Sequence, residues 1–264
     1  MTDLAALPQY QVTAINLGNL TLDKSVMTFQ SGAGNLVDVP VWGAAIEGNG
    51  LKILADTGVS TPERWHYMCP VWQEKDETLE AALAELGWRP NDIDIVINSH
   101  LHWDHCDNNW RLPNARFYVS LTEWEYAKNP IEIQKKLYKA DFNTGPLTVM
   151  NYVLVNQDLF EVVPGIKTIE TPGHSAGHQS TLVETSEGLL CVAGDAACFM
   201  ENLTAPTPPG GMTSATEALA SIDKMCRTAD RIFMNHDPEI KKYQQGGFPL
   251  VPRLAAREQP AVEP

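Results

Sequence analysis

The segment Ser99–His105 constrains the fold of this chain more than any other part of the sequence. It reads SHLHWDH and directly follows Ile93–Ile97, a mostly apolar run that is typical of a buried strand. Neutral imidazole and carboxylate groups are the ligands that zinc and similar divalent ions prefer. The sequence therefore predicts a buried strand that ends where several metal-binding side chains gather.

The order of these side chains suggests two metal ions. In an extended segment, His100 and His102 point to the same side of the chain. Asp104 and His105 are adjacent, so the chain must turn there if both are to bind metal, and this second pair then faces a different point in space. The alternative is an exposed polar turn whose histidines are incidental. Four candidate ligands within so short a segment argue against it.

Length, composition and charge limit the class of protein. With 264 residues, 44% of them hydrophobic and 20% charged, the chain is typical of a soluble globular protein with one large domain or two small ones. No apolar stretch reaches the ~18 residues of a membrane span. The formal net charge of −14 argues against a nucleic acid as partner, since such binding needs clustered Lys and Arg.

The N-terminal residues and the cysteines predict a cytoplasmic protein. Residues 1–11 lack the basic and apolar regions of a signal peptide. The five cysteines are unpatterned and include no C-x-x-C spacing, which favours reduced thiols over a disulfide framework. From Gly246 onward, proline and small polar residues predict a loosely held tail.

Hydrophobic periodicity predicts strands that alternate with helices. The expected strands are 10–22, 37–46, 51–55, 93–97, 116–119, 166–170, 179–184, 189–193 and 231–235, and the expected helices are 76–86, 122–138 with a break near Asn129-Pro130, and one that opens at Ser214. Residues 139–165 are expected to be irregular. Together, residues 62–73 and about 120–165 are expected to cover the site.

The chain also repeats one pattern. It twice runs from a strand ending in Asp, through a helix, to a strand that leads into His: from Asp56 to His100 and from Asp195 to His236, separations of 44 and 41 residues. Two such halves would each form a sheet with helices on one face. Packing the two sheets together gives a four-layer αββα sandwich, of mixed α/β (α+β) class, with the strand ends along one edge.

The histidine-rich segment resembles the signature of the metallo-β-lactamase superfamily. That pattern, His100-x-His102-x-Asp104-His105, is followed at the expected intervals by Thr171-Pro-Gly-His174, Gly194-Asp195 and Asn235-His236. The match runs from about residue 35 to 240, and five of the seven histidines fall on family positions. The resemblance implies the same αββα sandwich, as a single domain over residues 1–264.

The resemblance also implies a role for each residue of the centre. His100, His102 and His174 would hold one metal ion, Asp104, His105 and His236 the other, and Asp195 would bridge the two. Asp56 would orient a ligating histidine, and His178 would support the site without binding metal. The implied cofactor is a pair of divalent ions, zinc first, with iron, cobalt and manganese also suited to such ligands.

Among superfamily branches the chain looks most similar to the N-acyl-homoserine lactonases, the quorum-quenching enzymes, through Asn98-Ser99-His100 and His236-Asp237. The implied reaction is opening of a lactone ring by a metal-bridging hydroxide that attacks the carbonyl, with Asp104 as the proton shuttle. Alternatives are a pyridoxolactonase or another small-lactone hydrolase, a glyoxalase II-type thioesterase, and a mononuclear-iron persulfide dioxygenase. A glutathione thioester would need basic residues to bind it, and Lys241 and Lys242 are thin evidence for such a site.

Residues 62–73 are aromatic-rich but follow neither the helix nor the strand period. Such an apolar loop could cover the core, form a homodimer interface or wall a pocket for a small-molecule lactone. The pocket candidates within it are Trp65, His66 and Tyr67.

Cys198 marks a departure from the lactonase pattern. Those enzymes usually carry a tyrosine three residues after the bridging aspartate, and its hydroxyl touches the substrate. A thiol is shorter and a weaker hydrogen-bond donor than a phenol. Either another donor takes over, with Tyr67 as the candidate, or the preferred lactone differs.

Overall fold

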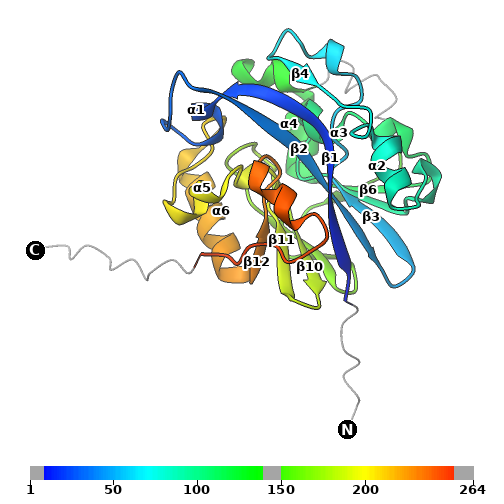
Figure 1. Ribbon diagram of the computed structural model, residues 1–264. Coiled ribbons are helices and arrows are strands. Elements are labelled where there is room, and N and C mark those ends of the chain that lie inside the picture. The colour runs from blue at the N-terminus through cyan, green and yellow to red at the C-terminus, as the bar shows by residue number, and fades with distance from the viewer. Residues whose placement is uncertain (1–8, 139–149, 253–264) are drawn as a thin grey trace, which may run out of the picture.

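The computed structural model describes residues 9–138 and 150–252, and within these ranges the chain forms two β-sheets (Figure 1). The first sheet has seven strands in the order β4-β1-β2-β3-β5-β6-β7: β1 Gln11–Asp23, β2 Leu36–Gly48, β3 Leu51–Ala55, β4 Val71–Trp72, β5 Ile95–Ile97, β6 Arg116–Ser120 and β7 Tyr152–Val155. The second has five in the order β12-β11-β10-β9-β8: β8 Phe160–Val163, β9 Ile166–Glu170, β10 Gln179–Thr185, β11 Gly188–Val192 and β12 Arg231–Phe233.

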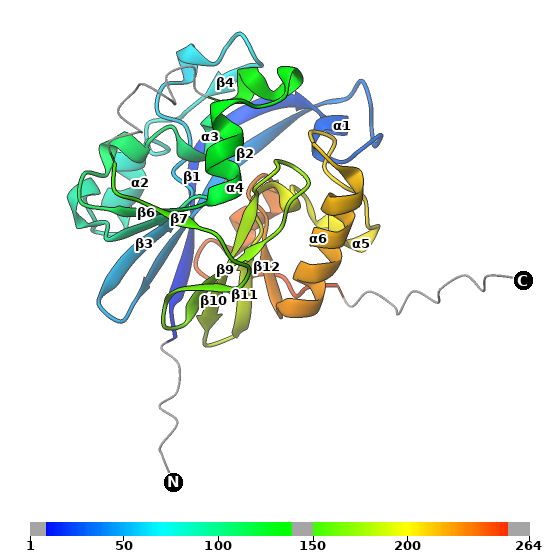
Figure 2. The same ribbon diagram turned by 180° about the vertical axis from the view of Figure 1, so that it is seen from behind.

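Helices cover the outer faces of both sheets (Figure 2). They are α1 Lys24–Met27, α2 Leu79–Glu85, α3 Trp103–Cys106, α4 Leu121–Lys128, α5 Met200–Thr204 and α6 Ala215–Thr228, with 3-10 turns that include Glu132–Leu137 and Pro238–Tyr243. No helix in the described part of the chain is long and apolar enough to cross a membrane.

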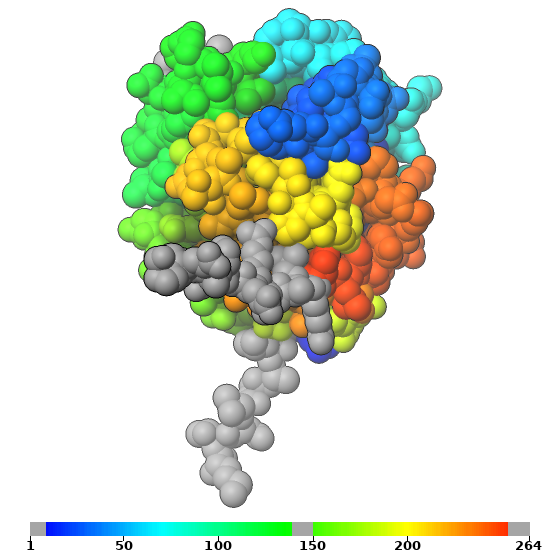
Figure 3. Space-filling model, turned by 90° about the vertical axis from the view of Figure 1, so that its left-hand side faces the viewer, coloured from blue at the N-terminus to red at the C-terminus, as the bar shows by residue number. Residues whose placement is uncertain are grey.

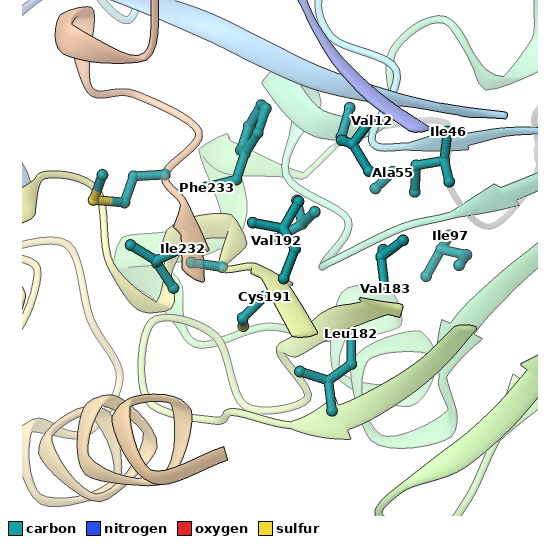
Figure 4. Packing of buried hydrophobic residues seen from close by; sticks show 14 of the residues in the cluster. Val12, Ile46, Ala55, Ile97, Leu182, Val183, Cys191, Val192, Ile232 and Phe233 are labelled. Atoms are coloured by element: carbon teal, nitrogen blue, oxygen red, sulfur yellow. The ribbon is translucent and has the colours of Figure 1, made fainter. Parts of the chain in front are cut away.

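Side-chain alternation along the strands builds the core. Ile97 of β5 belongs to the cluster between the sheets, where it faces Val183 of β10 (Figure 4). The preceding Val96 points to the opposite face and packs with Leu83 of α2. On the far face of the second sheet, Ile222 of α6 completes the same buried cluster. The expected four-layer αββα sandwich is confirmed.

The repeated half predicted from the sequence is present in the sheets. β3 and β5 are parallel neighbours joined through α2, and β11 and β12 are parallel neighbours joined through α6. Because parallel neighbours end at the same edge of a sheet, each pair brings its aspartate and its histidine together. This topology therefore accounts for the gathering of the candidate ligands at one edge of the two sheets, which we call the ligand edge.

Some element boundaries differ from the expectation. The helix predicted for 76–86 begins only at Leu79, because the Thr78 hydroxyl accepts a hydrogen bond from the Ala81 amide (3.3 Å) and caps it. The break predicted near Asn129-Pro130 is confirmed, since α4 ends at Lys128. Residues 150–165 are not irregular: they form β7 and β8, which pair with β6 and β9. Residues 139–149 lie outside the described residues.

The tail predicted to be loosely held is attached over residues 246–252. The Ile232 amide donates to the Pro249 carbonyl and the Val251 amide to the Asp230 carbonyl, both at 3.0 Å. Phe248 is only 3% exposed and packs against Phe233. This attachment could not be predicted from the local pattern, because it depends on backbone groups in and just before β12 that need partners. Residues 253–264 lie outside the described residues.

The packing of α2 on the first sheet can be tested with Leu83→Ala. This side chain is fully buried, so the cavity left behind should lower the free energy of unfolding by about 2–5 kcal/mol. Leu36→Ala is the matched control, because Leu36 is 73% exposed and its loss should cost less than about 0.5 kcal/mol. Urea unfolding of preparations with equal metal content measures both. Equal midpoints for the two variants would contradict this packing.

Candidate metal centre

The histidine-rich segment runs from the end of β5 into the short helix α3. Ile97 ends the strand, and His102 lies directly before the first helical residue, Trp103. Asp104 and His105 therefore sit on the first turn of α3. This helix is the turn that the adjacent pair required.

All seven side chains predicted to bind metal meet at the sheet edge. They form three overlapping groups whose ligand atoms lie within 4.8 Å of one another: His100, His102 and His174; His100, His105 and Asp195; and Asp104, His105 and His236. These residues come from both halves of the fold, so the site exists only when the two sheets are packed together.

Asp195 lies between the two sets of histidines. Its Oδ2 is 3.3 Å from His174 Nε2, and its Oδ1 is 3.3 Å from His105 Nε2 and 3.2 Å from His236 Nε2. Asp104 lies at one side, with its Oδ2 3.8 Å from the Nε2 atoms of both His105 and His236. A carboxylate placed as Asp195 is can reach two cations at once.

The donor atoms fit metal ions because several are buried without a hydrogen-bond partner in the described structure. They are the Nε2 atoms of His100 and His105 and Oδ1 of Asp195, and His102 Nδ1 and His174 Nε2 lie only 3.0 Å apart. Buried polar atoms are almost always hydrogen-bonded, so this convergence of bare acceptors needs another partner. Imidazole nitrogens and carboxylate oxygens are the donor set of a divalent transition-metal ion.

Asp56, a buried residue directly after β3, lies beside the centre, and its carboxylate accepts four hydrogen bonds. Oδ1 accepts from the Ser99 amide (2.8 Å), and Oδ2 from the Ser99 hydroxyl (2.7 Å), His105 Nδ1 (2.8 Å) and Asn235 Nδ2 (3.2 Å). Because a carboxylate only accepts, His105 carries its proton on Nδ1 and turns a bare Nε2 toward the other ligands. Asp56 adopts the left-handed region (φ +62°), a strained backbone common at functional sites.

His178 has both ring nitrogens engaged elsewhere. Its Nε2 accepts from the Asp195 amide (3.0 Å), and its Nδ1 is 2.9 Å from the Thr171 hydroxyl. Burial and the neighbouring His174 lower the pKa of His178 to about 3, so the ring is neutral and can accept this hydrogen bond. The geometry suits a residue that orients Asp195.

The histidines of the centre fall into two electrostatic classes. Burial and neighbouring imidazoles hold the pKa of His100 and of His102 well below the usual value. Burial also lowers the pKa of His105 and of His236, but Asp195 and the other nearby carboxylates together outweigh it and raise the pKa of both. The acidic neighbours that favour a positive charge at these two rings would also favour a cation bound among them.

The pocket candidates occupy two different environments. Trp65 is 4% exposed and stacks on Trp103 at a centroid distance of 4.6 Å, and the buried Cys198 belongs to the same apolar cluster. Tyr67 is 68% exposed and its hydroxyl donates to the Lys136 carbonyl (3.3 Å). His66 is exposed and its Nε2 lies 2.7 Å from the Val71 carbonyl.

Another side of the centre is built from segments distant in sequence. Residues 24–29 lie against residues 208–211, where the Gly210 amide donates to the Val26 carbonyl (2.9 Å) and the Phe29 amide to the Pro208 carbonyl (2.9 Å) (Figure 3). A side chain at Gly211 would touch both His174 and Val26. The N-terminal helix α1 thereby reaches the neighbourhood of the ligands.

Sequence reasoning missed Asn235 as a supporting residue. Its side chain accepts from the Gly194 amide (3.0 Å) and donates to Asp56 and to the Trp42 carbonyl (2.9 Å), so it connects the segments of Asp195 and His236 with Asp56 and β2. The available signal was its position directly before a candidate ligand at a strand end, which it shares with Ser99.

The fold and the site define the class of protein. Residues 37–233 match the family model described as the metallo-beta-lactamase superfamily, and the chain belongs to that superfamily. Within it, an N-acyl homoserine lactonase of Bacillus cereus is 32% identical over 243 residues, which cover 85% of this chain and 92% of that protein. The N-acyl homoserine lactonase AttM of Rhizobium radiobacter is 32% identical over 240 residues, or 83% and 90% of the two chains.

A solved structure agrees with these relatives. The crystal structure of a B. thuringiensis AiiA variant with N-decanoyl-L-homoserine bound at its active site superposes with a TM-score of 0.75 and 29% identity, covering 88% of this chain and 95% of that one. The resemblance to the N-acyl-homoserine lactonase-like branch is confirmed.

The role of Asp56 can be tested with Asp56→Asn. An amide cannot accept all four hydrogen bonds, so the tautomer and orientation of His105 should be lost, and metal affinity should fall about 10–100-fold. Asp76→Asn is the control, because Asp76 is exposed. Competition with a chromophoric chelator measures the affinity. An unchanged affinity in Asp56→Asn would contradict the assigned role.

Proposed function

We propose that this chain is a metal-dependent hydrolase that opens the ring of N-acyl-homoserine lactones and so acts in quorum quenching. The observation that carries the proposal is the convergence of seven candidate metal-binding side chains, among which Nε2 of His100 and His105 and Oδ1 of Asp195 are buried without a hydrogen-bond partner in the described structure. Its support from relatives is the similarity to an N-acyl homoserine lactonase over 92% of that protein's length.

The donor set is divided between two ions. His100, His102 and His174 would hold one, Asp104, His105 and His236 would hold the other, and Asp195 would lie between them. Zinc is the proposed metal, because imidazole and carboxylate ligands suit it; iron, cobalt and manganese accept the same ligands. Two divalent ions there would polarise a carbonyl oxygen and would lower the pKa of water, so that hydroxide is available as a nucleophile near neutral pH.

Asp104 is the proposed proton carrier. Its side chain is 13% exposed, against 7% for Asp195, so it is the more accessible of the two carboxylates. In the reaction, a water oxygen bonds to the lactone carbonyl carbon and the acyl–oxygen bond of the ring breaks. Asp104 takes a proton from the water at a carboxylate oxygen and delivers it to the ring oxygen that leaves. The new carboxylic acid then releases one proton to solvent.

The apolar cluster of Trp65, Trp103 and Cys198 is the proposed wall of the substrate pocket, with His66 and Tyr67 near its rim. Burial, together with Asp195 and Asp104, raises the pKa of the Cys198 thiol well above its usual value. The thiol therefore stays protonated, which argues against a role as nucleophile.

The proposed setting is the cytoplasm, with a small lactone as the partner and neither nucleic acid nor membrane bound. None of the five cysteines forms a disulfide in the described structure, and reduced thiols suit a cytoplasmic setting. A homodimer through residues 62–73 is also proposed, because Tyr67, a large apolar residue, is 68% exposed there. Light scattering on a sizing column should give twice the chain mass of 29.1 kDa. A mass equal to one chain would contradict the dimer.

The activity is tested by metal content and ring opening measured on the same preparation. We expect two metal ions per chain and proton release with N-acyl-homoserine lactones of short and long acyl chains. A chelator should abolish the activity, and zinc should restore it. Two bound metals without opening of any N-acyl-homoserine lactone would overturn the proposed substrate, and pyridoxolactone and thioesters would be tried next. One iron per chain would overturn the mechanism.

A further inference from the structure

Glu123 is a buried carboxylate that the proposed reaction does not use. It lies on the first turn of α4 and is 0% exposed. The Ser120 hydroxyl accepts from the Glu123 amide (3.4 Å) and caps the helix, so the side chain is not needed for capping. A charge removed from water in this way needs strong partners.

Four donors surround this carboxylate. Oε1 accepts from the Leu101 amide (3.1 Å) and the Tyr138 hydroxyl (2.9 Å). Oε2 accepts from the Ser175 hydroxyl (2.7 Å) and the Gly177 amide (3.1 Å). Each oxygen therefore binds one backbone N–H and one hydroxyl, and all four groups are satisfied by a carboxylate that only accepts.

The two backbone donors belong to the two loops that carry three of the proposed ligands. Leu101 lies between His100 and His102, and Gly177 lies three residues after His174. The loop that carries His174 lies close against α4, because a Cβ atom at Gly177 would clash with the Glu123 amide nitrogen. One side chain thus connects the two ligand loops directly.

The remaining partners act on the same histidines. The Tyr138 ring packs edge-on against the His102 ring at a centroid distance of 4.8 Å. Gln134, which follows α4, donates from Nε2 to the His174 carbonyl (3.1 Å) and accepts from the Tyr126 hydroxyl (2.9 Å). Segment 121–138 therefore packs against the side of the centre that is formed by His100, His102 and His174.

We propose that Glu123 is a positioning residue of the metal centre, which fixes the His100–His102 loop and the His174 loop at the separation that one shared ion requires. The inference rests on the proposed function, since it needs an ion held by these three histidines. Glu123 touches neither the ion nor the substrate in this role. It acts through the two backbone amides.

The chemistry of the four donors explains why glutamine cannot replace this glutamate. A hydroxyl can rotate and accept a hydrogen bond from an amide NH₂ group, so Tyr138 and Ser175 could adapt. A backbone N–H cannot. In either orientation of a glutamine side chain, its NH₂ group would face the amide of Leu101 or of Gly177. Glu123→Gln can therefore hold one ligand loop but not both.

Zinc or cobalt titration against a chromophoric chelator tests the inference, with Glu123→Gln compared with wild type and with Glu125→Gln. Glu125 is the matched control, because it lies on the same helix with a side chain that is 59% exposed and paired with Lys128 (2.7 Å). We expect Glu123→Gln to bind one of the two ions about 10–100-fold more weakly and the other within about threefold. Glu125→Gln should bind both ions as wild type does.

The outcomes separate this inference from the proposed function. Wild type that binds fewer than two ions overturns the dinuclear centre. Wild type that binds two, together with Glu123→Gln that binds both equally well, overturns the inference alone. An equal loss of both ions with a lowered unfolding midpoint would assign Glu123 to stability only and would also overturn it.

A measurement on metal-free wild type covers the case in which Glu123→Gln does not fold. The carboxylate accepts both backbone N–H groups with no ion required, so the amides of Leu101 and Gly177 should be protected from hydrogen exchange before metal is added. Exchange of either amide at the rate of an unstructured chain would overturn the inference.

Discussion

The hydrogen bonds to the buried carboxylate of Asp56 are the interaction on which the ligand edge depends. Ser99 and His105 reach this carboxylate from the segment that follows β5, and Asn235 reaches it from the end of β12 in the other sheet. Burying a charge is unfavourable unless donors surround it. Since the donors come from both halves, the charge is stabilised only when the two sheets are packed together in their native positions. The geometry of the centre and the assembly of the sandwich are therefore one requirement.

Glu123 has a similar position on the opposite side of the centre. Both carboxylates are buried and accept backbone and side-chain hydrogen bonds from segments that carry candidate ligands. Asp56 orients one ring, His105, whereas Glu123 connects two loops. Because the ligands come from several short loops with little regular structure of their own, their relative positions need such charged supports.

Much of this arrangement could be predicted from the sequence, because it depends on local pattern. The seven candidate ligands follow strand ends, and the Asp-helix-His repeat predicts that those ends meet at one edge. Glu123 could not be found in this way, since a glutamate on the first turn of a helix is ordinarily explained by the helix dipole. β7 and β8 were missed because four-residue strands show too little periodicity, and they become strands only through the partners they meet. The exposed position of Tyr67 likewise depends on tertiary contacts.

The segment 246–252 has a consequence for the behaviour of the protein at high concentration. β12 lies at one end of the five-stranded sheet, with β11 as its neighbouring strand, and its outer backbone groups would otherwise be open to pairing. An uncovered edge strand is a template for intermolecular β-association. The bridge between Arg231 and Leu250, with Phe248 buried beside it, occupies that edge with the chain's own backbone. A segment remote from the chemistry thereby protects the fold against aggregation.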